Sequence, residues 1–78
     1  MNIKILGTGC PKCNRLEQLT RAAAASLGIT PDFEHVTERA EIMKYPVVST
    51  PALVIDGQVV VAGRMPSPAE LEGWLRGR

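Results

Sequence analysis

The sequence predicts an α/β fold, with one mixed four-stranded sheet flanked by three helices in a single domain. Strand-like segments with alternating polar and apolar residues are interleaved with segments of helical apolar spacing, in the order β-α-β-α-β-β-α. An Asp-Gly pair joins the last two strand-like segments, as in a tight antiparallel hairpin. The chain has 78 residues, which leaves room for one domain, 1–78, and no internal repeat or linker interrupts it.

The first strand and first helix are predicted from the N-terminal third of the chain. Residues 2–6 alternate and are rich in β-branched side chains, and the Gly-Thr-Gly segment 7–9 then turns the chain. A helix is expected over about 11–27, because Pro11 suits a first helical position and apolar residues recur at helical spacing. Gly28 follows as the expected C-terminal cap.

A second strand and a short helix are expected in the middle of the chain. Residues 32–36 alternate again, and a right-handed crossover through the first helix would make this strand parallel to the first. Residues 38–45 are expected to form the short helix, with Ala40 and either Met43 or Ile42 facing the core, and the proline that follows would end it.

The last two strands form the predicted hairpin. Residues 51–55 are a nearly continuous apolar run, which is typical of a strand covered on both faces. Asp56-Gly57 is the turn, and residues 58–62 return antiparallel.

The final helix carries a start signal. Ser67 is the expected cap, Pro68 takes the first helical position, and Glu70 stands where a capping box needs an acid. The apolar face of this helix consists of Leu71, Trp74 and Leu75.

Composition and charge exclude several classes of function. Hydrophobic residues make up 45% and charged residues 22%, which is the composition of an ordered globular domain. Nine Lys and Arg against eight Asp and Glu leave a net charge of +1, too little to attract nucleic acid or an anionic membrane. The apolar stretch at 1–6 is too short for a signal peptide or a membrane span. We expect a cytoplasmic monomer with no nucleic-acid or membrane partner.

The two cysteines, Cys10 and Cys13, are three residues apart at the predicted strand-to-helix junction. A bridge across so short a loop stabilises the folded state little, so the pair indicates reactivity or metal binding. Cys10 falls at the helix start, where free amides and the helix dipole favour a thiolate, and Lys12 adds a positive charge. Cys13 shares a face with Leu16 and is expected to be the more buried cysteine. Cys10 would then attack a disulfide and Cys13 would resolve the mixed disulfide.

Other interpretations of the pair remain open at this point. The two cysteines could be small buried apolar residues, or ligands of a structural zinc ion. Zinc prefers four ligands, and only the acids and one histidine, His35, which has no ligand-like neighbour on its strand, could complete the set. A binding module could use both thiolates for a soft ion such as Cu(I) or arsenite. A redox-dependent interaction domain without turnover is a third possibility.

Thr50-Pro51 is the second candidate feature. A proline at the start of a buried strand removes a ladder donor, and it either opens an edge pairing or forms a deliberate cis kink. A plain turn proline is the more common situation in proteins. Here a core strand and a hairpin follow at once, so we predict a cis bond beside the cysteine pair.

With these two motifs, residues 9–13 and 50–57, the sequence resembles the thioredoxin-like superfamily, in particular its branch of small proteins called redox-active disulfide protein 2. The resemblance covers essentially the whole chain and implies a sheet ordered 2-1-3-4. It also implies that Thr50 lends backbone hydrogen bonds to an extended substrate, beside a cis Pro51. The implied partners are a protein disulfide and a recycling disulfide reductase. No organic cofactor and no resident metal are implied, because the redox centre is the pair of Cys10 and Cys13. Unlike thioredoxin, this chain has Gly9 before the first cysteine and no acid in residues 1–6.

Overall fold

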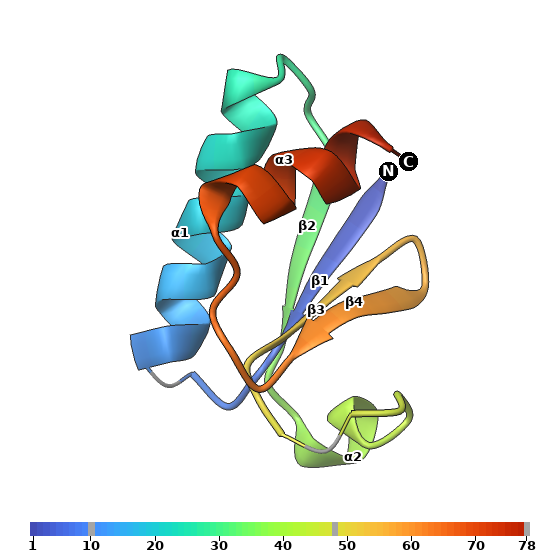
Figure 1. The fold of residues 1–78 in the computed structure, drawn as a ribbon. Coiled ribbons are helices and arrows are strands. Elements are labelled where there is room, and N and C mark those ends of the chain that lie inside the picture. The colour runs from blue at the N-terminus through green and yellow to red at the C-terminus, as the bar shows by residue number, and fades with distance from the viewer. Residues whose placement is uncertain (10, 48, 78) are drawn as a thin grey trace.

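The computed structural model describes residues 1–9, 11–47 and 49–77, and the predicted order of elements is confirmed (Figure 1). One four-stranded mixed sheet has the strand order β2-β1-β3-β4, as the resemblance implied. The elements are β1 (Asn2–Leu6), α1 (Pro11–Ser26), β2 (Asp32–Val36), α2 (Arg39–Ile42), β3 (Ala52–Ile55), β4 (Gln58–Ala62) and α3 (Pro68–Arg76).

The strand pairings follow the predicted connections. β1 pairs in parallel with β2 and antiparallel with β3, which in turn pairs antiparallel with β4. Asp56 and Gly57 have φ angles of 48° and 84°, the positive values that a two-residue hairpin turn requires. The Asp56 carboxylate accepts a hydrogen bond of 2.8 Å from the backbone N–H of Asn2, which ties the hairpin to the start of β1.

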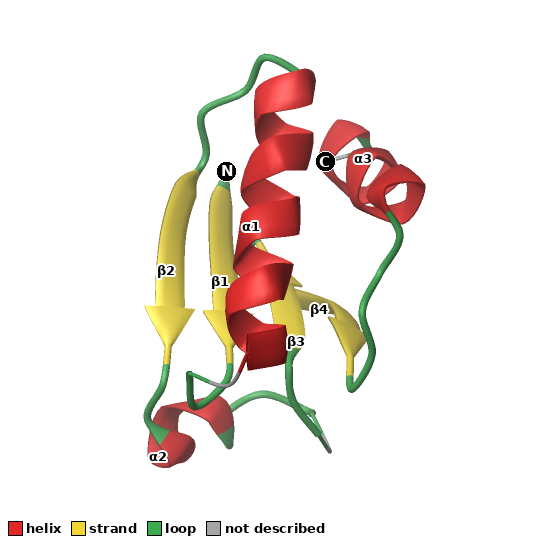
Figure 2. Cartoon of the chain, turned by 90° about the vertical axis from the view of Figure 1, so that its left-hand side faces the viewer, coloured by secondary structure: helices red, strands yellow, loops and turns green. Residues whose placement is uncertain are grey.

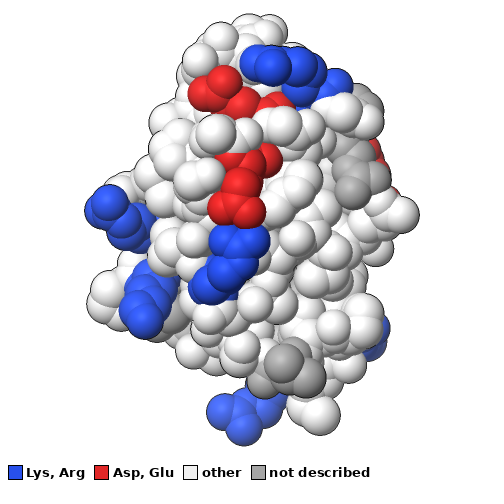
Figure 3. Space-filling view, viewed as in Figure 1, with Lys and Arg blue, Asp and Glu red and all other residues white. Residues whose placement is uncertain are grey.

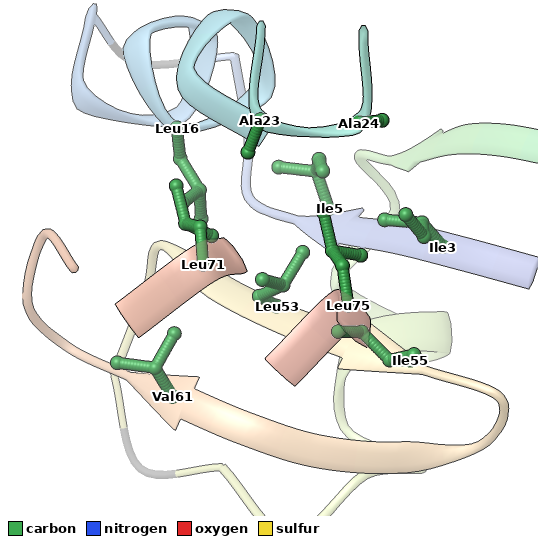
Figure 4. Close-up of a cluster of buried hydrophobic side chains, with 10 residues drawn as sticks. All are labelled: Ile3, Ile5, Leu16, Ala23, Ala24, Leu53, Ile55, Val61, Leu71 and Leu75. Carbon is green, nitrogen blue, oxygen red and sulfur yellow. The ribbon is translucent and has the colours of Figure 1, made fainter. Parts of the chain in front are cut away.

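The larger core lies between the sheet and the pair of helices α1 and α3 (Figure 2). Leucine side chains of both helices point toward isoleucine and leucine side chains of β1 and β3 (Figure 4). The buried members of this cluster are Ile3, Ile5, Leu16, Ala23, Ala24, Leu53, Ile55, Val61, Leu71 and Leu75. The alternation along each strand sends the intervening residues to the opposite face.

A smaller core covers the opposite face of the sheet. It takes one residue from α2 and partly buried residues from the segment that follows this helix. Its buried members are Leu6, Val36, Ile42, Ala52 and Val54. Helices therefore lie on both faces, as predicted, but the second face receives only one short helix.

The predicted cap at Gly28 is confirmed. Gly28 has a φ of 72°, and the N–H of Ile29 donates to the carbonyl of Ala24 over 3.1 Å while that of Gly28 donates to Ala25 over 3.1 Å. These two bonds satisfy carbonyls that the helix end would otherwise leave free. α1 ends at Ser26, one residue before the predicted limit.

α2 is shorter than predicted, since it spans Arg39–Ile42 and not 38–45. Beyond Ile42, Lys44 donates to the carbonyl of Glu41 and Tyr45 donates to that of Ile42, so the chain tightens to i→i−3 bonds. The expectation that Ala40 faces the core is wrong, and of the two alternatives Met43 and Ile42 it is Ile42 that does so. Ile42 alone turns inward, at 7% exposure, whereas Ala40 is exposed.

The start of α3 matches the sequence prediction. Ser67 Oγ accepts from the N–H of Glu70 over 3.1 Å, and Glu70 Oε1 accepts from the N–H of Ser67 over 2.9 Å. Arg64 donates to the same carboxylate from Nη1, to Oε1 over 3.1 Å, and from Nη2, to Oε2 over 2.8 Å. The hydrogen bonds from Arg64 and then the backbone of Ser67 lower the pKa of Glu70 from its ordinary 4.5 to about 2.

We predict that Glu70→Gln lowers the melting temperature at pH 7 and that the difference from the wild type vanishes in acid. A carboxyl whose pKa is depressed in the folded state stabilises that state above pH 4.5 and loses this effect as the pH falls to about 2. Circular dichroism melts at a series of pH values would measure the difference. Glu72→Gln in the same helix is the control, and curves of wild type and Glu70→Gln that run parallel through this window would contradict the prediction.

Candidate functional site

The two sequence motifs meet at one end of the sheet. The N-terminal end of α1 and the segment that leads into β3 both lie near α2 in Figures 1 and 2. Thr8, which comes just before the cysteine motif, and Ser49 and Thr50, which precede the proline, line one cleft of about 320 Å³. Segments some forty residues apart in the sequence therefore share a surface.

Cys13 is fully buried in the first turn of α1, on the same face as Leu16. Cys13 is buried, as expected, whereas the expectation that it is more buried than Cys10 stays a prediction. Cys10 lies outside the described residues, so its expected place at the helix start stays a prediction. Lys12 is exposed, so its positive charge lies at the surface in the first turn of α1.

Gly7 gives the Cys13 sulfur its space. The backbone of Gly7 is so close that a Cβ at this position would overlap Cys13 Sγ and would lie 3.0 Å from Cys13 Cβ. Because Cys13 has no solvent-facing space to move into, the absence of a side chain at position 7 is a requirement for this packing. The sequence indicated only that Gly7 belongs to a turn.

The Thr50–Pro51 peptide bond is cis, as predicted. Pro51 is buried and Thr50 is exposed, and the carbonyl of Pro51 accepts a hydrogen bond of 2.9 Å from the N–H of Gly63. The Ser49 side chain occupies the space in which Gly63 would carry a Cβ, so this loop packs closely on the chain that leaves β4. The proposed role of Thr50 toward a substrate stays a prediction.

His35 has a neighbour that the sequence analysis missed. Its Nδ1 lies 3.1 Å from Glu17 Oε1 on α1, and Glu17 also accepts from Arg21 over 3.0 Å. The Arg21 guanidinium in turn stacks over the Phe33 ring at 4.3 Å. The expectation that His35 has no ligand-like neighbour is therefore wrong, because strand pairing and helix packing bring together residues eighteen positions apart. Nε2 of His35 is buried and has no hydrogen-bond partner among the residues that the structure describes.

Two further properties concern the described residues only. His, Cys, Asp and Glu side chains within 1–9, 11–47 and 49–77 form no group of three that could hold a metal ion. In the same part of the chain, no helix has the length and apolar character that crossing a bilayer requires.

The sheet order, the shielded cysteine near the start of α1 and the cis-proline before β3 define a thioredoxin-like fold. A family model described as thioredoxin domain matches residues 1–76. Thioredoxin from Methanothermobacter thermautotrophicus is 38% identical over 75 residues, covering 96% of this chain and 97% of that protein. Thioredoxin from Methanocaldococcus jannaschii is 38% identical over 74 residues, covering 95% and 85%.

The chain belongs to the thioredoxin family. This membership supports a thioredoxin-like redox function of the oxidoreductase class. The narrower branch of redox-active disulfide protein 2 stays a prediction.

We predict that Gly7→Ala reduces the free energy of unfolding by about 1–3 kcal/mol, the usual cost of forcing an extra methyl group into a packed interior. Gly73→Ala is the matched control, since a Cβ at this helical position meets no atom within 4 Å. This control should raise stability by about 0.5–1 kcal/mol, because alanine loses less backbone entropy in a helix. Urea denaturation with a reductant present measures both, and a Gly7→Ala protein as stable as the wild type would refute the packing argument.

Proposed function

We propose that this protein is a dithiol–disulfide oxidoreductase that exchanges disulfides with a protein partner through Cys10 and Cys13. The observation that carries the proposal is the complete burial of Cys13 within the first helical turn, three residues after Cys10. In such a pair the shielded thiol cannot meet a bulky substrate, so it is suited to the second, intramolecular step.

The proposed exchange runs in two steps. The Cys10 thiolate attacks one sulfur of a substrate disulfide, which forms a mixed disulfide and releases the other substrate sulfur as a thiolate. Cys13 then loses its proton and attacks the Cys10 sulfur, which releases the second substrate thiolate. Two electrons have passed to the substrate, and the Cys10–Cys13 disulfide remains. A disulfide reductase would return the pair to the dithiol form, so no organic cofactor is needed.

Other residues are assigned supporting roles. Lys12, exposed in the first turn of α1, together with the positive end of the α1 dipole, would favour the thiolate of Cys10. Thr50 is exposed beside the buried Pro51, and its backbone would pair with an extended substrate in the manner of an added strand.

We predict that Cys13→Ser accumulates mixed disulfides with substrate proteins, whereas Cys10→Ser forms none and has no exchange activity. The reason is that the second thiol is needed only to release the substrate. Non-reducing gels of cell extract treated with each variant, followed by mass spectrometry of the trapped proteins, measure the difference. Equal trapping by the two variants would contradict the assigned roles.

We also predict that Cys10 is alkylated before Cys13 in the reduced protein. Cys13 has no exposed surface, and a thiolate at the helix start reacts at a pH where an ordinary thiol does not. A brief iodoacetamide pulse at mildly acidic pH, followed by peptide mapping, measures the order. Faster labelling of Cys13 would reverse the assignment of nucleophile and resolving thiol.

A further inference from the structure

We infer that Arg39 and Met43 select the substrate, by binding an extended segment of the partner protein that carries an apolar and an acidic side chain next to its disulfide. The inference rests on the proposed function, because the segment is the one that presents the reacting sulfur. It adds a substrate class, acidic disulfide-bearing proteins, and two specificity-determining residues on α2.

The cleft at the site end of the sheet is where such a segment would lie. Its walls come from the turn before the cysteine motif, from α2 and from the loop that holds the cis-proline. The lining residues are Thr8, Arg39, Ile42, Met43, Val47, Ser49 and Thr50. A segment that pairs with the backbone at Thr50 therefore runs beside α2 as it approaches the cysteines.

The geometry of α2 presents Arg39 and Met43 together. The N–H of Met43 donates to the carbonyl of Arg39 over 2.9 Å, so the two residues are one helical turn apart and share a face. Ile42, buried in the smaller core, holds this face in place. The packing of the domain therefore fixes the orientation in which Arg39 and Met43 face the cleft.

Met43 is the apolar contact. Met43 is 74% exposed, and Met1, at 39%, is the other large apolar residue classed as exposed in the described part of the chain. An unbranched thioether adapts to differently shaped apolar partners, and proteins use methionine in this way at binding surfaces. An exposed methionine at the rim of a cleft beside a reactive pair is suited to contact with a substrate side chain.

Arg39 gives the cleft its charge. Among the described residues that line it, Arg39 is the single charged one. The nearby acid Glu41 is directed elsewhere, because it pairs with Lys44 at 2.9 Å and lines a separate pocket with Lys4. Within the described residues, the lysines and arginines that form ion pairs are Arg21, Lys44, Arg64 and Arg76. The guanidinium of Arg39 is therefore available to a partner.

One face of the molecule has the same sign at this end. On the face shown in Figure 3, acidic groups gather in the upper part over α3, whereas the lower end, where α1 begins and α2 lies, displays basic groups only. Lys12 and Arg15 on the first turns of α1 are both exposed there. Complementary charge raises the association rate and orients the partner, so a carboxylate near the substrate cysteine is the chemistry that fits.

The test uses pre-reduced protein in single-turnover reactions with three synthetic peptides. Each peptide carries one cysteine as a mixed disulfide with 2-mercaptoethanol, flanked by leucine and aspartate, leucine and asparagine, or serine and aspartate. The wild type is compared with Arg39→Gln, Arg39→Glu and Met43→Gln. Arg76→Gln, an exposed arginine at the far end of α3, is the matched control.

The wild type and Arg76→Gln should reduce the aspartate peptide about 2- to 5-fold faster than the asparagine peptide, because one exposed ion pair changes a rate by about this factor. High salt screens the ion pair and should abolish the difference. Arg39→Gln should bring the ratio to about one, and Arg39→Glu should invert it. Met43→Gln should lower the preference for leucine over serine by about threefold.

Two failures are distinguishable. If the wild type reduces the aspartate and asparagine peptides equally fast, or if its preference survives Arg39→Gln, the inference is overturned and the proposed function stands. If the wild type reduces none of the peptides and does not reduce the neutral 2-hydroxyethyl disulfide, the proposed function is overturned together with the inference.

Discussion

The packing of one face of α1 against β1 is the constraint on which the rest of the structure depends. This face buries its side chains completely or nearly so, and it includes the resolving cysteine of the proposed mechanism. Its members are Cys13, Leu16, Thr20, Ala23 and Ala24. The single polar member, Thr20, donates from Oγ1 to the carbonyl of Leu16 over 2.7 Å, so the buried hydroxyl has a partner. The packing that buries the apolar side chains of this face therefore also places the Cys13 sulfur below the protein surface.

The smaller core has a corresponding effect on the opposite face of the sheet. Ile42 buries against Leu6, Val36, Ala52 and Val54, and this contact positions a helix of only four residues. A helix so short has little stability of its own, so tertiary packing holds it beside the proline loop. The same contact sends Arg39 and Met43 outward, and the exposed side of α2 becomes part of the cleft. The position of α2 and the proposed substrate specificity therefore both depend on the buried side chain of Ile42.

The candidate site was only partly predictable. The two motifs are visible in the sequence, because a cysteine pair after a strand and a proline before an apolar run are local patterns. The cis bond at Pro51 and the burial of Cys13 were anticipated from them. The requirement for glycine at position 7 was not, since it comes from the approach of a strand end to a helical side chain. The contact of His35 with Glu17 was missed for the same reason.

The sequence by itself determined the features that depend on neighbouring residues. The order of elements, the Asp56-Gly57 turn and the capping box of Ser67 and Glu70 follow from backbone dihedral preferences and hydrogen bonds that span a few positions. Tertiary structure alone decided where α2 ends, which of its residues turns inward, and that α2 shares a cleft with Thr8 and Thr50. These outcomes depend on contacts between segments that are distant in the sequence. Such contacts can stabilise the fold only after the sheet has brought the segments together.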